Sequence, residues 1–329
     1  MKERIYLLPK EGNFYKANMH CHTTISDGKL TPEQVKEEYQ KNGYQIVAFT
    51  DHKKYCPHPE LNSQDFLSLA GVETDINEIR PGKERIRTRM FHINFYDTNP
   101  DEMPEEKAKY CAADYWNYDF SYVNAYIKKM KKLGFLASYN HPYWSMQNYD
   151  EYAKLDGLFA MEIYNHGCEL DGLYGYNPQA YDEMLRSGKK IFCLATDDNH
   201  NEYPIGHPLC DSFGGFTMIK AKELTYPAVM NALEKGDFYS SMGPVINSLY
   251  IEGNELVVET SPVQKIYVKM EGKNCYMKVA PPGERIKAAR FTLTGREGFI
   301  RVACRTEKGN FANSNAYFLE DLPVEFTTE

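Results

Sequence analysis

The sequence predicts a mixed α/β protein, with a TIM-like parallel β/α barrel followed by a small all-β domain. Short apolar runs alternate with amphipathic stretches as far as residue 243, the pattern of parallel strands connected by helices. After Gly243-Pro244 the helical stretches stop, and short strands and turns continue. The 329 residues suffice for a barrel of roughly 200–250 residues and a smaller domain. We therefore expect domains at 1–243 and 244–329, the second similar to a β-sandwich.

The composition excludes several classes of protein. Hydrophobic residues make up 42% and charged residues 26% of the chain, as in ordinary globular proteins. The net charge of −8, without any basic run, argues against a surface that binds long nucleic acids. No stretch approaches the ~20 apolar residues of a membrane span, and the N-terminus has no apolar signal core. Eight cysteines without paired spacing fit reduced thiols, so we expect a cytoplasmic protein; its oligomeric state is not indicated.

Helix and strand signals alternate in the first part of the chain. A helix should begin after Thr31, an N-cap residue followed by Pro32 and by Gln34, which is placed to close a capping box. Gly43 is a natural stop for this helix. After a first strand that leads into His20, buried strands are expected at 45–50, 66–72 and 90–96.

A polar segment at 97–121 interrupts the alternation, and we expect it to cross the barrel mouth. The helical stripe from Tyr122 to Lys132 and the stop at Gly134 resume the pattern. Further strands are expected at 135–139, 158–164, 190–195 and near Phe216, with helices at 177–188 and 226–235.

The last part of the chain shows only strand and turn signals, and no helix is evident there. Gly253-Asn254 lies between two short apolar runs and predicts a β-hairpin. The expected strands include 249–251, 256–258, 266–268, 291–293 and 299–302.

Two histidines and a carboxylate after the first strand indicate a metal site. His20 and His22 are one residue apart, so on an extended backbone both side chains point to the same face. Asp27 follows in a Ser-Asp-Gly turn, where a positive φ at Gly28 would bring the carboxylate back toward the imidazoles. A His-x-His pair alone is often incidental, but the rest of the chain supplies further ligands at the same kind of place.

Metal-ligating side chains recur at the ends of the predicted strands. Because the carboxyl ends of parallel barrel strands meet on one face, these side chains should converge there. We prefer Asp198 to Asp197 as a ligand, because its two-residue offset from His200 points both side chains to one side. Most of the candidate ligands follow the end of a predicted strand, whereas Asp27 lies in the turn beyond one and His92 lies within one. The candidate ligands are His20, His22, Asp27, His52, Glu73, His92, His141, Asp198 and His200.

These motifs resemble those of the PHP family, the polymerase and histidinol phosphatase superfamily of metal-dependent phosphoesterases. The resemblance covers about residues 14–243 and implies a distorted seven-stranded (β/α)7 barrel that holds two to three divalent ions of zinc, manganese or iron. It rests on the motifs His20-Cys21-His22, Thr50-Asp51-His52, Gly71-Val72-Glu73, Phe91-His92, His141-Pro142 and Asp198-Asn199-His200.

The resemblance also implies how the ligands divide among three ions. Glu73 would bridge the first and second ions. Many relatives carry histidine where this chain has Asp27, and a hard carboxylate there suits the third site to Mn²⁺ or Fe²⁺. By this assignment the first ion has His20, His22, Glu73 and Asp198, the second has Glu73, His92 and His141, and the third has Asp27, His52 and His200.

The chemistry expected of such a site is hydrolysis of a phosphate ester by a metal-activated hydroxide. Three divalent ions outweigh the charge of three ligand carboxylates, so the pocket would attract a phosphate. We expect a small phosphorylated metabolite as substrate and assign Glu73 and Asp198 to catalysis, with His207 binding phosphate or protonating the leaving group. The alternatives are a PHP nuclease that trims oligonucleotides, a metal-dependent esterase or amide hydrolase, and a metal-stabilised binding module.

Several other residues keep open roles. His207 is as easily a loop-packing residue as a catalytic one. His166 and Asn165 follow a strand end and could line the pocket, and Glu162 is either a buried acid or a pocket group. Cys21, between two ligands, should point to the opposite face and pack. One arginine of a charged cluster could reach the substrate: Arg80, Arg85, Arg87 or Arg89.

Overall fold

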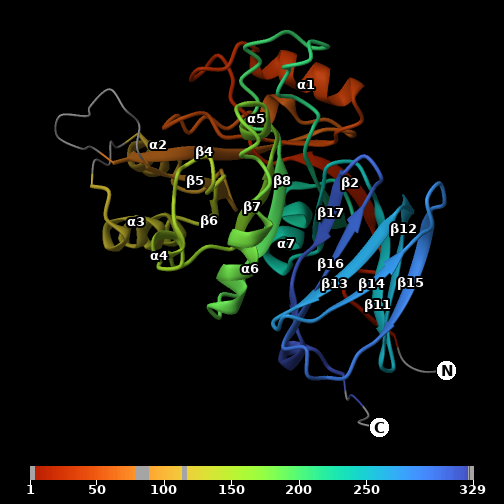
Figure 1. Cartoon of the computed structure of the whole chain (residues 1–329). Coiled ribbons are helices and arrows are strands. Elements are labelled where there is room, and N and C mark those ends of the chain that lie inside the picture. The colour runs from red at the N-terminus through yellow and green to blue at the C-terminus, as the bar shows by residue number, and fades with distance from the viewer. Residues whose placement is uncertain (1–3, 79–88, 113–116, 325, 327–329) are drawn as a thin grey trace.

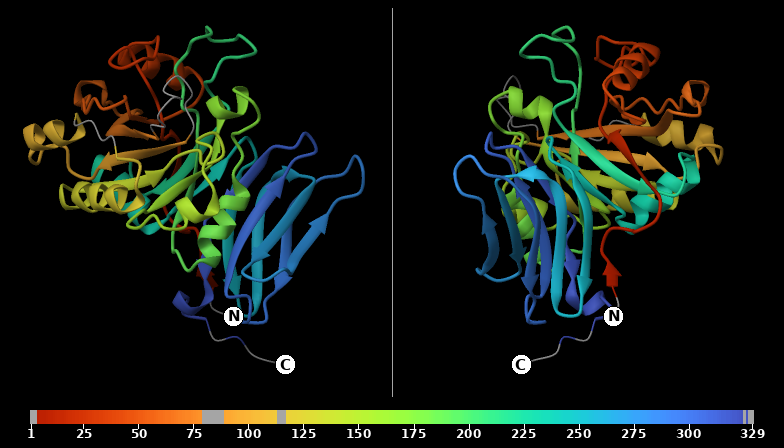
Figure 2. Two further views of the ribbon diagram at one scale, coloured as in Figure 1. Left: turned by 60° about the vertical axis from the view of Figure 1, so that its left-hand side comes forward. Right: turned by 90° about the vertical axis from the view of Figure 1, so that its right-hand side faces the viewer.

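The computed structural model describes residues 4–78, 89–112, 117–324 and 326. The protein is a mixed α/β structure with one large and one small β-sheet (Figure 1). Helices pack on the N-terminal part of the large sheet, and the C-terminal strands, some of which continue this sheet, form an all-β region beside it (Figure 2).

The predicted strands of the first region are confirmed, and seven of them pair in the order in which they occur along the chain. They are β2 (Asn13–Asn18), β3 (Ile46–Phe49), β4 (Leu67–Asn77), β5 (Met90–Asp97), β6 (Phe135–Tyr139), β7 (Ala160–Asn165) and β8 (Phe192–Thr196). All neighbouring pairs are parallel except those of β5, which runs antiparallel to β4 and β6. The prediction of an all-parallel barrel is therefore wrong at β5. The antiparallel pair of β4 and β5 ends with Asn77 opposite Met90, so these two strands form a ribbon instead of a parallel β/α unit.

The first and last of these seven strands meet beyond their carboxyl ends. The backbone N–H of Asp198 donates to the carbonyl of His20 (3.0 Å), and that of His22 donates to the carbonyl of Asn199 (3.1 Å). On its other side β2 pairs antiparallel with β9 (Phe216–Ala221), which continues the sheet. The described chain thus forms a mixed, partly closed sheet: the mixed α/β character is confirmed, whereas the TIM-like barrel that the alternation predicted is not.

Helices begin where capping signals are present. α1 (Pro32–Lys41) follows Thr31, whose side chain accepts from the N–H of Gln34 in the predicted capping box. α3 (Phe120–Lys132) begins earlier than expected, because Asp119 caps it. The segment expected only to cross the barrel mouth contains α2 (Pro104–Cys111). The remaining helices are α4 (Tyr149–Tyr152), α5 (His166–Leu170), α6 (Pro178–Arg186) and α7 (Tyr226–Lys235), with a 3-10 turn at Pro59–Leu61.

The C-terminal region consists of strands and one 3-10 turn, Leu319–Asp321. Its strands are β11 (Ile246–Glu252), β12 (Glu255–Val263), β13 (Lys265–Met270), β14 (Cys275–Val279), β15 (Ile286–Thr292), β16 (Phe299–Arg305), β17 (Phe311–Ser314) and β18 (Tyr317–Phe318). The predicted hairpin is confirmed, with Glu252 opposite Glu255. Side chains from both sheets, such as Ile251 and Val302, share one buried core, as in a β-sandwich.

Hydrogen-bonded strands join the two regions across the boundary predicted at 243/244. At the N-terminus, β1 (Arg4–Tyr6) pairs with β11, so this strand of the first region completes the small sheet. β10 (Phe238–Ser241) pairs with β9 on one side and with β17 on the other, so the large sheet runs through both regions.

A buried ion pair also joins the two regions, and breaking it should destabilise the protein. Arg301 on β16 is 1% exposed, and its Nε donates to Oδ1 of Asp182 on α6 at 2.7 Å. Asp182→Asn would leave the guanidinium charge buried without its partner, so we expect a loss of about 3–5 kcal/mol in the free energy of unfolding, measured by urea denaturation. The matched control is Asp321→Asn, which removes the exposed pair of Asp321 with Lys190 and should leave the free energy of unfolding nearly unchanged, because solvent screens this pair.

The stabilisation from this pair should also depend on pH. Burial raises the pKa of Asp182, but the charges of Arg301 and Lys269 outweigh burial and lower the pKa below its ordinary value. The pair therefore contributes fully above the pKa of the unfolded carboxyl, about 3.9, and its contribution is lost as the pH falls through the lower pKa of the folded state. Equal acid sensitivity of the wild type and Asp182→Asn would contradict this assignment.

Within the ranges described, no helix combines the length and the apolar character that crossing a membrane requires. The eight cysteines are all free thiols.

Candidate metal centre

The structure brings all nine predicted ligand residues together in three groups. Within each group, one potential ligand atom per residue lies within 4.8 Å of every other. The first group is His20, His22, Glu73 and Asp198, the second is Glu73, His92 and His141, and the third is His22, Asp27, His52 and His200. A pocket of about 420 Å³ opens onto them, and Trp144, Leu170, Tyr203 and Leu209 also line it.

The first group is the tightest. Nε2 of His20 and Nε2 of His22 are 3.0 Å apart, and they lie 3.0 and 3.1 Å from Oδ1 of Asp198. Both nitrogens lie 3.3 Å from Oε2 of Glu73. Bonds of about 2.0–2.2 Å to a tetrahedral ion separate neighbouring ligand atoms by about 3.3–3.6 Å. The four atoms are therefore spaced nearly as the ligands of a single ion.

Glu73 connects the second group to the first through its other oxygen. Oε1 of Glu73 lies 3.0 Å from Nδ1 of His92 and 3.6 Å from Nε2 of His141. The side-chain amide of Asn140 donates to the same oxygen at 2.8 Å. Trp144 packs edge-on beside this group, with its ring centroid 5.0 Å from that of His141. Glu73 thus contacts both groups, one through each oxygen, which is the arrangement that bridging by this residue would require.

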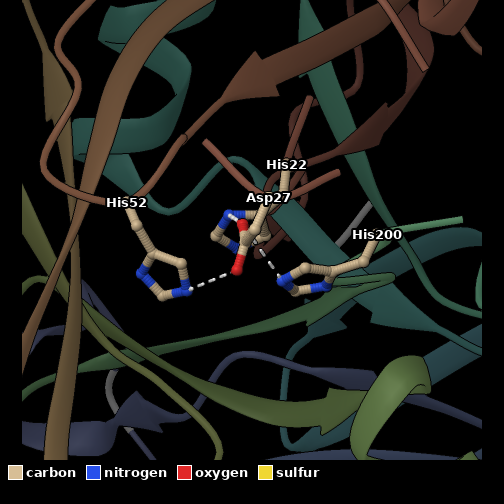
Figure 3. Close-up of side chains that lie close together, drawn as sticks. All are labelled: His22, Asp27, His52 and His200. Carbon is tan, nitrogen blue, oxygen red and sulfur yellow. Dashed lines mark ion pairs between the residues drawn. The ribbon is translucent and has the colours of Figure 1, made fainter. Parts of the chain in front are cut away.

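The third group surrounds Asp27, whose carboxylate points toward the rings of His22, His52 and His200 (Figure 3). Oδ1 of Asp27 lies 3.6 Å from Nδ1 of His22 and 3.6 Å from Nε2 of His200, and Oδ2 lies 3.8 Å from Nε2 of His52. His22 turns Nε2 to the first group and Nδ1 to the third, so its ring lies between them. The Asp27 side chain is 55% exposed, whereas that of Glu73 is 1% exposed. We therefore expect this group to hold its ion least tightly.

A buried carboxylate shapes the loop that carries Asp27. Oδ1 of Asp51 accepts from the backbone N–H of Thr23 (2.8 Å) and of Ser26 (3.1 Å), and both hydroxyls donate to it as well. A Cβ at Gly28 would lie only 2.4 Å from the carbonyl oxygen of His22. The expected positive φ at Gly28 is wrong: glycine is required there for this close approach, and its φ is outside the left-handed region.

Two residues of these groups have an unusual backbone conformation. His141 and Asp198 have φ angles of 25° and 54°, in a region that non-glycine residues seldom adopt. Such conformations cost of order 1–3 kcal/mol and cluster at functional sites. Glu73, in contrast, lies inside β4 opposite Asn94. The expectation that Glu73 follows a strand end is therefore wrong, because β4 continues as one arm of the pair with β5.

Glu162 and Asn165 of β7, whose roles the sequence left open, position the ligands. Oε1 of Glu162 lies 2.7 Å from Nδ1 of His20, which leaves Nε2 of that ring for the first group. The amide of Asn165 donates to Oε2 of Glu162 (2.9 Å) and to Oδ2 of Asp198 (3.0 Å). A carboxylate on the far nitrogen of a ligand histidine sets its tautomer and orientation. The sequence signal for this role was a glutamate inside an otherwise apolar strand.

Buried carboxylates and imidazoles shift one another's pKa values. Burial raises the pKa of Glu73 and of Asp198, but neighbouring histidines, His20 foremost, outweigh burial and lower both. At His22 burial lowers the pKa, but the carboxylates of Asp198 and Glu73 outweigh burial and raise the pKa to about 9. Burial dominates at His52 and lowers its pKa to about 4. Glu73 and Asp198 are therefore anionic at neutral pH, the form that binds metal ions.

The donor set fits divalent metal ions. Nδ1 of His22 and Oδ1 of Asp198 are buried and make no hydrogen bond within the described part of the chain. A buried polar atom without a hydrogen bond lowers the stability of the protein by about 1–3 kcal/mol, and a bound cation would offset this loss. Imidazole nitrogens with carboxylate oxygens are ligands of zinc, manganese and iron.

Other predicted residues lie apart from the three groups. Asp197 accepts from Tyr39 and from the backbone N–H groups of residues 213–215, so it holds a loop. His207 stacks on Tyr203 with ring centroids 4.6 Å apart and is not among the residues that line the pocket. Its placement does not support the predicted catalytic role.

The remaining residues with open roles are structural where the structure describes them. His166 Nδ1 bonds to the hydroxyl of Tyr164 (2.9 Å), and Cys21 packs in a buried core cluster. Arg89 pairs with Glu78 and Glu151. Arg80, Arg85 and Arg87 lie outside the described residues.

Comparisons with known proteins were made by sequence and by structure. No protein-family model matches the chain, and no curated protein matches its sequence. Among solved structures, the chain is similar to a two-domain protein from Bacteroides vulgatus that contains a predicted PHP-like metal-dependent phosphoesterase. That match has 16% identity and a TM-score of 0.45 and covers 95% of this chain and 97% of that chain.

Two further solved structures match about three fifths of this chain. One is a proposed metal-dependent phosphoesterase from Bifidobacterium adolescentis, with 14% identity, a TM-score of 0.38 and coverage of 62% of this chain and 93% of that chain. The other is an amidohydrolase from Chromobacterium violaceum with bound sulfate and no metal, with 14% identity, a TM-score of 0.39 and coverage of 59% and 93%. The solved structures to which this chain is similar thus include a protein with a predicted PHP-like metal-dependent phosphoesterase, a proposed metal-dependent phosphoesterase and an amidohydrolase.

Proposed function

We propose that the protein is a metal-dependent hydrolase of the PHP type that cleaves a phosphate ester of a small metabolite. One observation carries the proposal: three groups of ligands share Glu73 and His22 and meet below one open pocket. A binding module stabilised by metal needs neither shared ligands nor a pocket onto them. The seven strands β2–β8 would correspond to the distorted barrel that the family resemblance implies.

The side chains around the groups would hold and shield the reaction centre. Bound divalent ions would supply polarisation of the phosphoryl oxygens and a water ionised near neutral pH. Asn140 and Glu162 orient Glu73 and His20 through the hydrogen bonds described above. Trp144 and Leu209 form an apolar part of the wall and would limit the entry of bulk water.

The lining of the pocket supports a small substrate. The pocket volume of about 420 Å³ lies within the range of small-molecule sites, about 300–1,000 Å³. Within the described residues the lining contains no lysine or arginine, so the ions would be the main attractor for a phosphate. A polynucleotide would need several more cationic contacts than this wall offers.

An activity screen tests the proposal. The full chain is reconstituted with zinc, manganese or iron and assayed against phosphorylated metabolites, oligonucleotides, carboxyl esters and amides. Release of inorganic phosphate from a metabolite, lost when the ions are chelated, is the expected result. Faster turnover of an ester or amide would assign the site to carbonyl chemistry, which the same ligand groups can serve. No turnover of any class by the metal-loaded protein would favour a binding module.

The effect of salt separates a small substrate from a polynucleotide. Six to ten phosphate contacts to Lys and Arg cost roughly 10³–10⁵ in affinity between 50 and 200 mM salt. We expect kcat/KM for the best substrate to fall by less than about tenfold over this range, which corresponds to one or two contacts. The measurement compares a mononucleotide with a matched oligonucleotide. A steep salt slope, together with faster cleavage of the oligonucleotide, would establish the nuclease instead.

A further inference from the structure

Cys168 lies in the wall of the pocket, next to two of the proposed metal ligands. It is 3% exposed and belongs to α5, which directly follows β7. Its Sγ, a ring nitrogen of His141 and a carboxylate oxygen of Asp198 all lie within 4.8 Å of one another. Among the residues that the structure describes, no other cysteine belongs to a group of this kind.

Hydrogen bonds hold Cys168 against the segment that carries Asp198. Oδ1 of Asn165 accepts from the backbone N–H of Cys168 at 2.9 Å, while the amide of the same side chain donates to Oδ2 of Asp198 at 3.0 Å. The N–H of Gly167 donates to the carbonyl of Asp197 at 2.8 Å, and a Cβ at Gly167 would lie 3.1 Å from the carbonyl oxygen of Asp198. The turn is therefore docked closely on the ligand segment.

His141 belongs both to the second group and to the group that contains Cys168. Nδ1 of His141 bonds to Ser145 (3.1 Å), so Nε2 is the nitrogen free to bind an ion. This Nε2 lies 3.6 Å from Oε1 of Glu73 and 3.7 Å from Oδ2 of Asp198, so it faces both the second group and the side of Cys168.

We propose that Cys168 is a metal ligand. Together with His141 and Asp198 it forms a binding position for a soft ion, which contains a thiolate and lies beside the second group. Because both positions use Nε2 of His141, one ion occupies one or the other. Thiolates favour zinc and carboxylates favour manganese, so zinc would take the Cys168 position. When the Zn–S bond forms, the thiol proton passes to solvent and no oxidant is needed. The inference rests on the proposed metal-binding function.

X-ray absorption at the zinc edge of the zinc-loaded full chain tests the proposal directly. We expect a sulfur neighbour at about 2.3 Å in the wild type, which Cys168→Ser abolishes. The matched control is Cys111→Ser, a buried cysteine at the end of α2 that lies outside all three groups and should keep the signal. The wild-type spectrum decides the question even if a variant folds poorly.

Competition between zinc and manganese gives a second readout that does not depend on activity. The preference of the wild type for zinc should fall about tenfold or more in Cys168→Ser, since even outer contacts of ligands are worth about 10–100-fold in metal affinity. Zinc bound without a sulfur neighbour would overturn the role of Cys168 and leave the proposed function standing. A chain that binds no zinc, manganese or iron would overturn both.

Discussion

Replacing Glu73 by glutamine should remove more metal than the loss of any single histidine and should abolish turnover. Its two oxygens face different groups, Oε2 toward His20 and His22 and Oε1 toward His92 and His141. A neutral amide offers one weak oxygen ligand and no charge, so the first and second ions should both be lost. We expect activity to fall by more than about 10³-fold, beyond the 10²–10³ that removal of one electrostatic group costs.

Metal content measured by mass spectrometry, for Glu73→Gln beside His92→Ala, tests this expectation. Glu202→Gln is a matched control, because Glu202 lines the same pocket and undergoes the same loss of charge but belongs to none of the three groups. It should retain its ions and most of its activity. Full metal content and normal turnover in Glu73→Gln would show that Glu73 does not bridge two ions.

Asp198→Asn should lose the first ion and nearly all activity, whereas Asp197→Asn should keep its ions. Oδ1 of Asp198 lies 3.0 and 3.1 Å from the two imidazole nitrogens of the first group. Asp197 is also fully buried, but it accepts hydrogen bonds from Tyr39 and from the loop at 213–215. An amide there weakens these bonds, so we expect a loss of about 1–3 kcal/mol in stability without a loss of metal.

The two aspartates therefore make a matched pair, one residue apart with the same substitution. Metal analysis should show a loss of metal only in Asp198→Asn. Urea denaturation of the metal-free proteins should show the larger loss of stability in Asp197→Asn. If Asp197→Asn lost the ion while Asp198→Asn kept it, the ligand assignment and the pairing with His200 would both be reversed.

Local sequence patterns predicted most of the elements and the residues that gather in the site. Caps and apolar stripes depend on neighbours within a turn or two, so Thr31 and Gln34 predicted the start of α1 correctly. All nine members of the three groups were predicted, most of them as polar residues at the ends of apolar runs, but His92 lies within such a run and Asp27 in a turn; their role as ligands stays a prediction.

Residues beside those motifs were harder to interpret, because their function is to hold a neighbour. Asp51 precedes His52 in the sequence, but its partners are Thr23 and Ser26, which lie on another loop. Asn140 precedes His141 and contacts Glu73. Adjacency to a ligand was the only signal for them, and it does not reveal the partner.

By itself, the sequence determined the α/β character of the first region, the all-β character of the second and the cluster of histidines and carboxylates. Only the tertiary structure decided that β5 runs antiparallel, that β1 joins the C-terminal sheet, and that Cys168 and Glu162 face the ligands. Periodicity and capping are properties of residues close together in the chain, so the sequence alone is sufficient to recognise them. Strand direction and side-chain contacts depend on how segments far apart in the chain pack, as between Arg4 and Glu252. The free energy of this packing depends on both segments, so no single stretch of sequence reveals it.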